Sequence, residues 1–201
     1  MCIGEAIAEA LETAIVNGNG TTKPVGMIKN KVVDEEEGTV TYEDKTPIAI
    51  TSFDPAQMGT IYAGLAIARN GKTRPVTDVI CVVNSQDYYK KIIPAVMYRN
   101  ALGEYVQRTA LPVRFVISEA VATNKAVLGM GKLYDLLLGL GKEGKMEYSD
   151  EFKFLDDVRT IKQKMFANGL AKDNNAFVVL DIENLQPDYF NVKVVEEEQS
   201  A

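Results

Sequence analysis

The stretch 139–145 has the spacing in this sequence that comes nearest to a nucleotide-binding loop. Gly139, Gly141 and Gly144 satisfy the pattern G-x-G-x-x-G, in which glycines let the backbone approach a pyrophosphate. The pattern belongs after a strand and before a helix. Here residues 134–138 are predicted to be helical and β-favouring residues follow, so the order is reversed. We therefore interpret the stretch as a glycine-rich helix end.

The same residues nearly spell a second phosphate-binding motif, the P-loop, with Lys145 in the place of its lysine. That motif needs a Ser or Thr hydroxyl on magnesium directly after the lysine. Met146 stands there instead. A small nucleotide-binding enzyme is therefore the less favoured alternative for this chain, and we expect no stabilisation by ATP, GTP or NAD.

Paired carboxylates and paired cations are the other groups that could do chemistry. Asp156–Asp157 and Glu35–Glu36 could act as acid and base, while Lys90–Lys91 with Tyr88–Tyr89 could stack on a nucleic-acid base. Each pair lies in a hydrophilic run, which is typical of a solvated surface. We therefore interpret all of them as surface residues.

The composition removes several classes of function. The chain has no histidine, which excludes hydrolase triads of Ser or Cys with His and removes the commonest metal ligand. Cys2 and Cys81 stand too far apart for a zinc motif and are interpreted as plain apolar residues. A net charge of -6 disfavours direct DNA binding. We assign no catalytic, cofactor-binding or metal-ligating residue, and we expect no cofactor.

Two helices are predicted from apolar residues at spacings of three and four. The first covers 2–16 and ends at the glycines of 17–20, where positive φ is available. It has no capping residue before Ile3, so we expect the helix to continue upstream and the chain to be a fragment. The second follows the cap Asp54 and Pro55 and runs to Gly71.

The rest of the chain alternates strand and helix signals. A surface hairpin with an acidic turn at 34–38 is predicted from the β-favouring stretches 31–33, 39–42 and 47–51. Strands are predicted at 77–83, 113–117, 125–128 and 177–182. Helices are predicted from Asn84 onward, with a kink at Pro94, and over 132–138. Periodicity leaves 146–166 undecided, and the acidic segment after Pro187 is expected to be a loose tail.

Several sequence segments, in the same order along the chain, resemble those of a known protein family. Residues 14–27, AIVNGNGTTKPVGM, resemble the phrase that ends a long helix in the major capsid proteins of tailed bacteriophages. Further similarity follows in chain order at 78–89, 111–113, 116–121, 126–130 and 152–180. Together these segments extend over nearly the whole chain.

The resemblance implies an α+β, two-lobed capsid subunit fold. Residues 1–50 and 145–172 would form a discontinuous peripheral domain with a long spine helix and long strands. Residues 51–144 and 173–187 would form an axial domain with a central mixed sheet flanked by helices, followed by the acidic tail 188–201. Relatives carry an N-terminal arm and an extended loop ahead of the spine helix, and we expect this chain to lack both. The resemblance also makes us assign 158–166 to a strand.

The function implied is that of a structural subunit, not an enzyme, which self-assembles into the icosahedral head of a tailed phage or prophage. Its partners would be copies of itself in pentamers and hexamers, with scaffold or portal proteins, and neither sequence-specific nucleic acid nor membrane. It would be located in the virion and assembled in the bacterial cytoplasm. As a fragment it is expected to fold as a monomer or weak ring without closing shells. An encapsulin-like cargo shell is the alternative.

Overall fold

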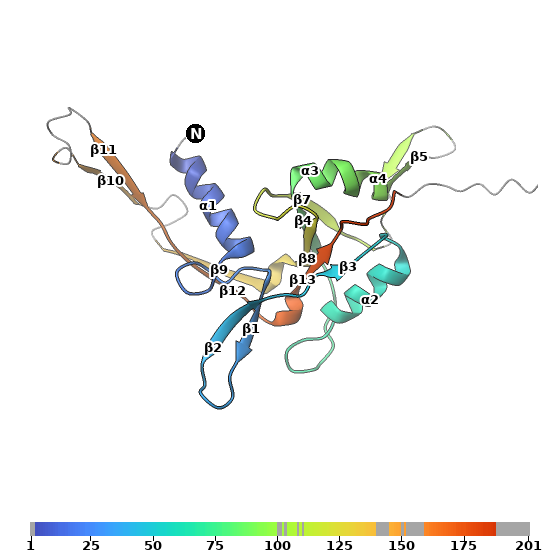
Figure 1. Ribbon diagram of the computed structural model, residues 1–201, viewed down its shortest axis with the longest axis horizontal. Coiled ribbons are helices and arrows are strands. Elements are labelled where there is room, and N and C mark those ends of the chain that lie inside the picture. The colour runs from blue at the N-terminus through green and yellow to red at the C-terminus, as the bar shows by residue number, and fades with distance from the viewer. Residues whose placement is uncertain are drawn as a thin grey trace, which may run out of the picture.

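The computed structural model describes residues 3–99, 102, 104–107, 109, 111–139, 145–149, 151 and 159–187. Its centre is a five-stranded mixed sheet in the order β3-β13-β8-β4-β7 (Figure 1). The β4–β7 and β13–β3 pairs are parallel, and β8 is antiparallel to both β4 and β13. These strands are β3 (Ile48–Ala49), β4 (Val79–Val83), β7 (Arg114–Ile117), β8 (Lys125–Met130) and β13 (Phe177–Asp181).

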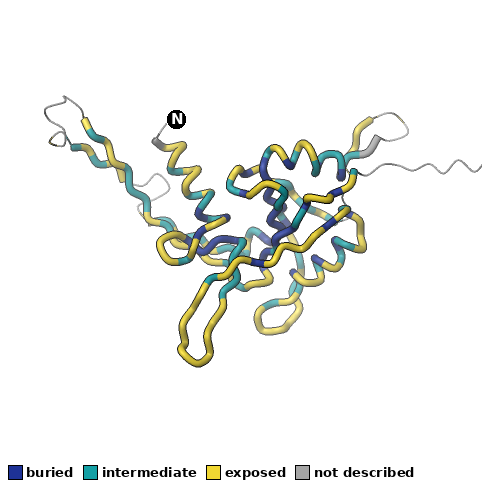
Figure 2. Tube along the Cα trace, in the orientation of Figure 1, coloured by how far each residue is buried: buried dark blue, intermediate teal, exposed yellow. Residues whose placement is uncertain are grey.

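The central strands alternate their side chains between two hydrophobic clusters, as a period of two requires. In β4, Val79, Cys81 and Val83 enter one cluster and Val82 enters the other. In β8, Leu128 enters the first cluster and its neighbour Val127 the second. The central strands β13, β8 and β4 are therefore buried on both faces, while the edge strands β3 and β7 are largely exposed (Figure 2).

Helices cover one of these faces. They are α2 (Pro55–Leu65), α3 (Ser85–Asp87), the π-helical turn Tyr88–Ile92 and α4 (Ile93–Val96). Met58, Leu65 and Ile92 pack from them into the first cluster. Asp54 begins α2 as predicted, because its carboxylate accepts a hydrogen bond of 2.8 Å from the Gln57 N–H. The predicted irregularity at Pro94 is a π-helical turn directly before it, in keeping with a proline that supplies no N–H.

The opposite face is covered by the end of α1 (Ile3–Asn17) and the segment after it. Val16 and Met27 pack there against Phe177. Only the last part of α1 is buried, and the rest of the helix runs beside a two-stranded ribbon (Figure 1, Figure 2). The predicted first helix is thus confirmed over the described residues.

Two hairpins stand away from the sheet. The first pairs β1 (Lys29–Val33) with β2 (Val40–Asp44), as predicted, and projects downward in Figure 1. The second pairs β5 (Met97–Arg99) with β6 (Tyr105–Gln107). The predicted strands at 77–83, 113–117, 125–128 and 177–182 are confirmed as β4, β7, β8 and β13. The acidic tail after Pro187 lies outside the described residues.

The predicted helix over 132–138 is wrong. A 3-10 turn, Gly131–Leu133, leads into strand β9 (Tyr134–Gly139), which pairs antiparallel with β12 (Phe166–Ala171). Leucines 136, 137 and 138 are good helix formers. However, β12 provides a hydrogen-bonding partner strand along all of β9, and this tertiary pairing outweighs the local helix propensity.

Candidate assembly surface

Among the described elements, a two-stranded ribbon projects away from the sheet, toward the upper left in Figure 1. Its inner half is β9 with β12, in the register Tyr134↔Ala171 to Gly139↔Phe166. Its outer half is β10 (Lys145–Ser149) with β11 (Thr160–Lys164), in the register Lys145↔Lys164 to Ser149↔Thr160. The strand predicted for 158–166 is confirmed over Thr160–Lys164, and Phe166 already begins β12.

The side chains of the ribbon alternate between two faces. Residues 161, 163, 165 and 167 share one face, because they are two apart on an extended strand. This inner face lies against α1 near the sheet, where Gln163, Met165 and Ala167 line a groove of about 290 Å³ with Ile7 and Leu11. The groove is open, since most of α1 remains exposed.

The inner face continues beyond α1, and no other described element covers it there. In the outer half, Tyr148 lies opposite Ile161 and is followed on the same side by Met146. Tyr148 is 59% exposed and Ile161 45% exposed. Arg159 lies over the Tyr148 ring at 5.6 Å from its centroid. The described outer half of the ribbon, called the ribbon tip below, thus presents an apolar face to solvent.

The other face of the outer half is charged. Lys164 binds Glu147 at 2.7 Å and Lys145 approaches the same carboxylate at 3.4 Å. Hydrogen bonds from these two lysines hold the pKa of Glu147 below its usual range. The outer half is therefore amphipathic, and it is the apolar side that lacks a covering element among the described residues.

The outer face of the inner half adds a second exposed apolar group. Leu137 is 73% exposed and Phe166 64%, with Leu170 beside them. Gly139 stands opposite Phe166, and a Cβ there would lie 3.2 Å from the Phe166 Cβ. A two-stranded ribbon is only marginally stable by itself, so this much exposed apolar surface on both faces fits a second molecule.

The phrase at 14–27 joins α1, the ribbon and the sheet. A Cβ at Gly18 would lie 1.9 Å from the Pro24 carbonyl oxygen, so glycine is needed for this close approach. Gly20 has φ +73°, the positive value predicted for this turn. The Asn19 side-chain oxygen accepts from the N–H groups of Thr21, Thr22 and Lys23.

The same turn makes three long-range attachments. The Val25 N–H donates to the Gly169 carbonyl of β12 at 2.8 Å. The Tyr134 hydroxyl of β9 donates to the Val25 carbonyl at 2.9 Å. The Asn17 amide donates to the Ala120 carbonyl in the loop after β7. The phrase therefore fixes the direction in which the ribbon leaves the body.

The candidate nucleotide-binding stretch 139–145 is flanked by strands in the described part of the chain. Gly139 ends β9 and Lys145 begins β10, while 140–144 lie outside the described residues. The glycine-rich stretch thus follows a strand, contrary to the prediction, and leads into a second strand where a nucleotide-binding loop would open a helix. Asp156–Asp157 also lie outside the described residues.

The other candidates have structural surroundings. Lys91 donates to the Asn124 side chain at 2.5 Å and to the Ile182 carbonyl, and Tyr88 packs against Phe115. Glu35 and Glu36 are exposed at the hairpin turn.

Cys81 is fully buried, which raises its pKa to about 12 and makes the thiol unreactive, while Cys2 lies outside the described residues. Within the described ranges, no three His, Cys, Asp or Glu residues gather as a metal site. In that same part of the chain, no helix combines the length and apolarity needed to cross a membrane.

Comparison with known proteins gives a structural likeness. No protein family model matches the chain, and no curated protein matches it. The capsid of an empty GTA particle is similar at TM-score 0.54 and 16% identity, and the capsid of the native GTA particle at 0.54 and 17%. Both matches cover 90% of this chain and 63% of the capsid chain.

A satellite phage P4 procapsid matches more weakly, at TM-score 0.41, 15% identity, 76% of this chain and 45% of the other, and adds no argument. This chain spans 63% of the length of the GTA capsid chains. The predicted α+β architecture around a central mixed sheet is present, and the chain shares the fold of the GTA capsid chains over the matched residues.

Proposed function

We propose that this chain is a structural subunit of the head shell of a tailed phage or prophage, which encloses a genome. The observation that carries the proposal is the projecting ribbon, whose tip exposes Tyr148 and Ile161 and whose inner half exposes Leu137 and Phe166. Surface of this kind on a two-stranded arm is stabilised when another molecule covers it. The capsid fold supports the same conclusion.

The proposed subunit has two lobes. α1 and the ribbon belong to the peripheral lobe, and the five-stranded sheet with its helices to the axial lobe. The boundary predicted at residue 144 would divide the inner half of the ribbon, since β9 pairs with β12. The division into a peripheral domain (1–50 and 145–172) and an axial domain (51–144 and 173–187) therefore remains a proposal. Limited proteolysis would test it.

The proposed mechanism is assembly without catalysis. Many copies associate through surfaces that are individually modest, and stability accumulates over the closed array. The partners proposed are copies of the same chain in pentamers and hexamers, with scaffold or portal proteins during assembly in the bacterial cytoplasm. The net charge of -6 suits an inner wall that does not hold DNA during packaging.

Particles purified by density gradient from cells that carry the gene test this function. We expect mass spectrometry to identify this chain as a main protein of particles that contain nuclease-protected DNA. Particles filled with protein and free of DNA would indicate an encapsulin-like cargo shell. Absence of the chain from all particles, with the protein recovered as a free monomer, would contradict the proposal.

A further inference from the structure

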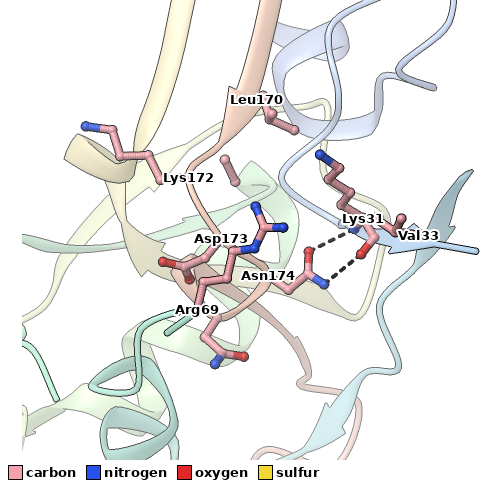
Figure 3. A pocket seen from close by; sticks show the side chains of 9 residues that line it. Lys31, Val33, Arg69, Leu170, Lys172, Asp173 and Asn174 are labelled. Atoms are coloured by element: carbon pink, nitrogen blue, oxygen red, sulfur yellow. Dashed lines mark hydrogen bonds between the residues drawn. The ribbon is translucent and has the colours of Figure 1, made fainter. Parts of the chain in front are cut away.

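A basic pocket lies at the root of the β1–β2 hairpin, between β1, the loop after α2 and the end of β12. It has a volume of about 290 Å³ (Figure 3). Asn174 fixes one wall, because its amide oxygen accepts from the Lys31 N–H at 2.8 Å and its amide nitrogen donates to the Lys31 carbonyl at 2.9 Å. Asn175 fixes the other by donating to the Ile67 carbonyl at 3.0 Å. The pocket is held open by its own hydrogen bonds.

Cations line this pocket. The side chains of Lys31 and Arg69 line it, and no ion pair to either occurs among the described residues. Asp173, which also lines the pocket, is engaged by Arg74 through both carboxylate oxygens. Lys172 approaches Asp135 at 3.5 Å, and its ammonium points away from the other two cations in Figure 3.

The turn of the same hairpin carries the opposite charge. The Asp34 carboxylate accepts from the N–H groups of Glu36 at 2.8 Å and Glu37 at 3.2 Å, which shapes the turn. The side chains of Glu35, Glu36 and Glu37 are exposed, and within the described part of the chain they make no ion pair. The hairpin thus has unpaired anions at its turn and one unpaired cation, Lys31, at its root, where Arg69 of the loop after α2 adds a second cation.

These charges do not pair with one another within the described part of the molecule. Val32 and Val33 are paired with Thr41 and Val40, so the hairpin is extended up to its turn. Asp34 begins the turn three residues after Lys31, which at roughly 3.3 Å per residue is on the order of 10 Å along the chain. The exposed turn is therefore available to the pocket of a neighbouring molecule.

We propose that the acidic turn Glu35–Glu37 of one subunit inserts into the Lys31–Arg69 pocket of a second copy. The proposal rests on the proposed shell function and names one of its contacts. Arg69 offers a planar fork that matches a carboxylate, and Lys31 adds a second donor. A tip-to-root contact joins different surfaces on the two partners, so it propagates around a ring.

The energy of one such contact is modest, because exposed ion pairs contribute about 1 kcal/mol or less each. Its effect is to orient neighbours and exclude wrong pairings. Repetition around a ring then multiplies a weak contact into a stable assembly. Salt should weaken it, since exposed charges are screened.

Carbodiimide cross-linking of a mixture of ¹⁴N- and ¹⁵N-labelled full chain locates the contact. The reagent joins carboxylates to amines that are in contact, and the mixed labels separate intermolecular from intramolecular products. We expect mixed-label cross-links between Glu35–Glu37 and Lys31. Cross-links to Lys31 that come only from residues 196–198, or only from elsewhere, would overturn the assignment of the turn.

Charge reversal tests the energy of the contact. We expect Lys31→Glu with Arg69→Glu, and separately Glu35→Lys with Glu36→Lys, to weaken self-association roughly tenfold or more in sedimentation velocity. Mixing the two variants should restore it, because each supplies the charge that the other lost. The control Lys90→Glu with Arg114→Glu makes the same change of charge at exposed positions away from the pocket, and should associate as the wild type does.

The outcomes separate this inference from the proposed function. Wild-type self-association that persists in both reversed variants overturns the hairpin contact and leaves the shell function standing. Reversed variants that both fail and do not complement each other also overturn it. A wild-type chain that forms no intermolecular cross-link to Lys31 at any concentration overturns the contact, while the shell function is tested separately by the composition of purified particles.

Discussion

At the scale of single residues, the turn after α1 is packed so closely that only glycine fits at one of its positions. Gly18 lies where a Cβ would be 1.9 Å from the Pro24 carbonyl oxygen and 2.4 Å from that of Ala14. Both obstacles are backbone atoms, which cannot swing away as a flexible side chain can. The sequence phrase is thus explained by close packing at Gly18 and by positive φ at Gly20.

Gly18→Ala should therefore lower the free energy of unfolding by at least about 2 kcal/mol, as overpacking does. Urea titration followed by circular dichroism measures it. Gly59→Ala in α2 is the matched control, because nothing lies within 4 Å of its Cβ position, and it should stabilise by about 0.5–1 kcal/mol. Equal effects of the two substitutions would contradict this account of the turn.

Lys45 is a buried cation, with only 9% of the residue exposed. Its ammonium donates to the Asn30 side chain at 2.5 Å and to the Asn174 carbonyl at 2.6 Å. Burial lowers the pKa of Lys45 to about 8, and Asp173 opposes that shift. The unfolded chain therefore holds this proton to a higher pH than the folded protein.

Between about pH 8 and about pH 10 the unfolded state binds more protons at this site, so the contribution of Lys45 to stability rises with pH. We expect the wild type to gain up to about 3 kcal/mol relative to Lys45→Met across this window. Comparing the two proteins removes the titration of every other group. A difference in unfolding free energy that stays constant or shrinks with pH would contradict the buried, desolvated lysine.

At the scale of elements, the sequence predicts correctly those features that depend on residues close together in the chain. The strand β4, the cap at Asp54 and the turn after α1 each depend on neighbouring residues, and each is present as predicted. The prediction of a helix at β9 is wrong because the strand is stabilised by its partner β12, which lies far away in sequence and leaves no local signal. The ribbon as a site was missed for the same reason, although the alternation of Met146 and Tyr148 was a signal for its outer half.

The apolar face of the ribbon tip gives a prediction at this scale. Ile161→Lys should abolish association between subunits because it places a charge on the face that we expect a neighbour to cover. It should change the unfolding free energy by no more than about 0.5 kcal/mol, since the side chain is exposed in the single subunit. Size-exclusion chromatography with light scattering measures the association.

Thr160→Lys is the matched control for this experiment. Thr160 is the neighbour of Ile161 in β11 and points to the charged face beside Lys162 and Lys164. We expect it to assemble as the wild type does. If both substitutions abolish association, added charge alone is responsible and the apolar face is not the interface.

At the scale of the whole molecule, two projections leave a compact sheet in different directions, and both have unmatched surfaces (Figure 1). The ribbon has uncovered apolar faces, and the β1–β2 hairpin has separated charges of opposite sign. Apolar contacts favour association in general, while charges select one neighbour and one orientation. This combination suits a subunit that must meet many identical copies in a fixed geometry.

Negative-stain electron microscopy of the protein made from the complete reading frame that encodes this chain is the most direct test of the shell function. The wild type and Ile161→Lys would be expressed in parallel, each with and without the proteins encoded beside it. We predict uniform closed shells from the wild type and none from Ile161→Lys. Monomers alone from the wild type under every condition would contradict the account.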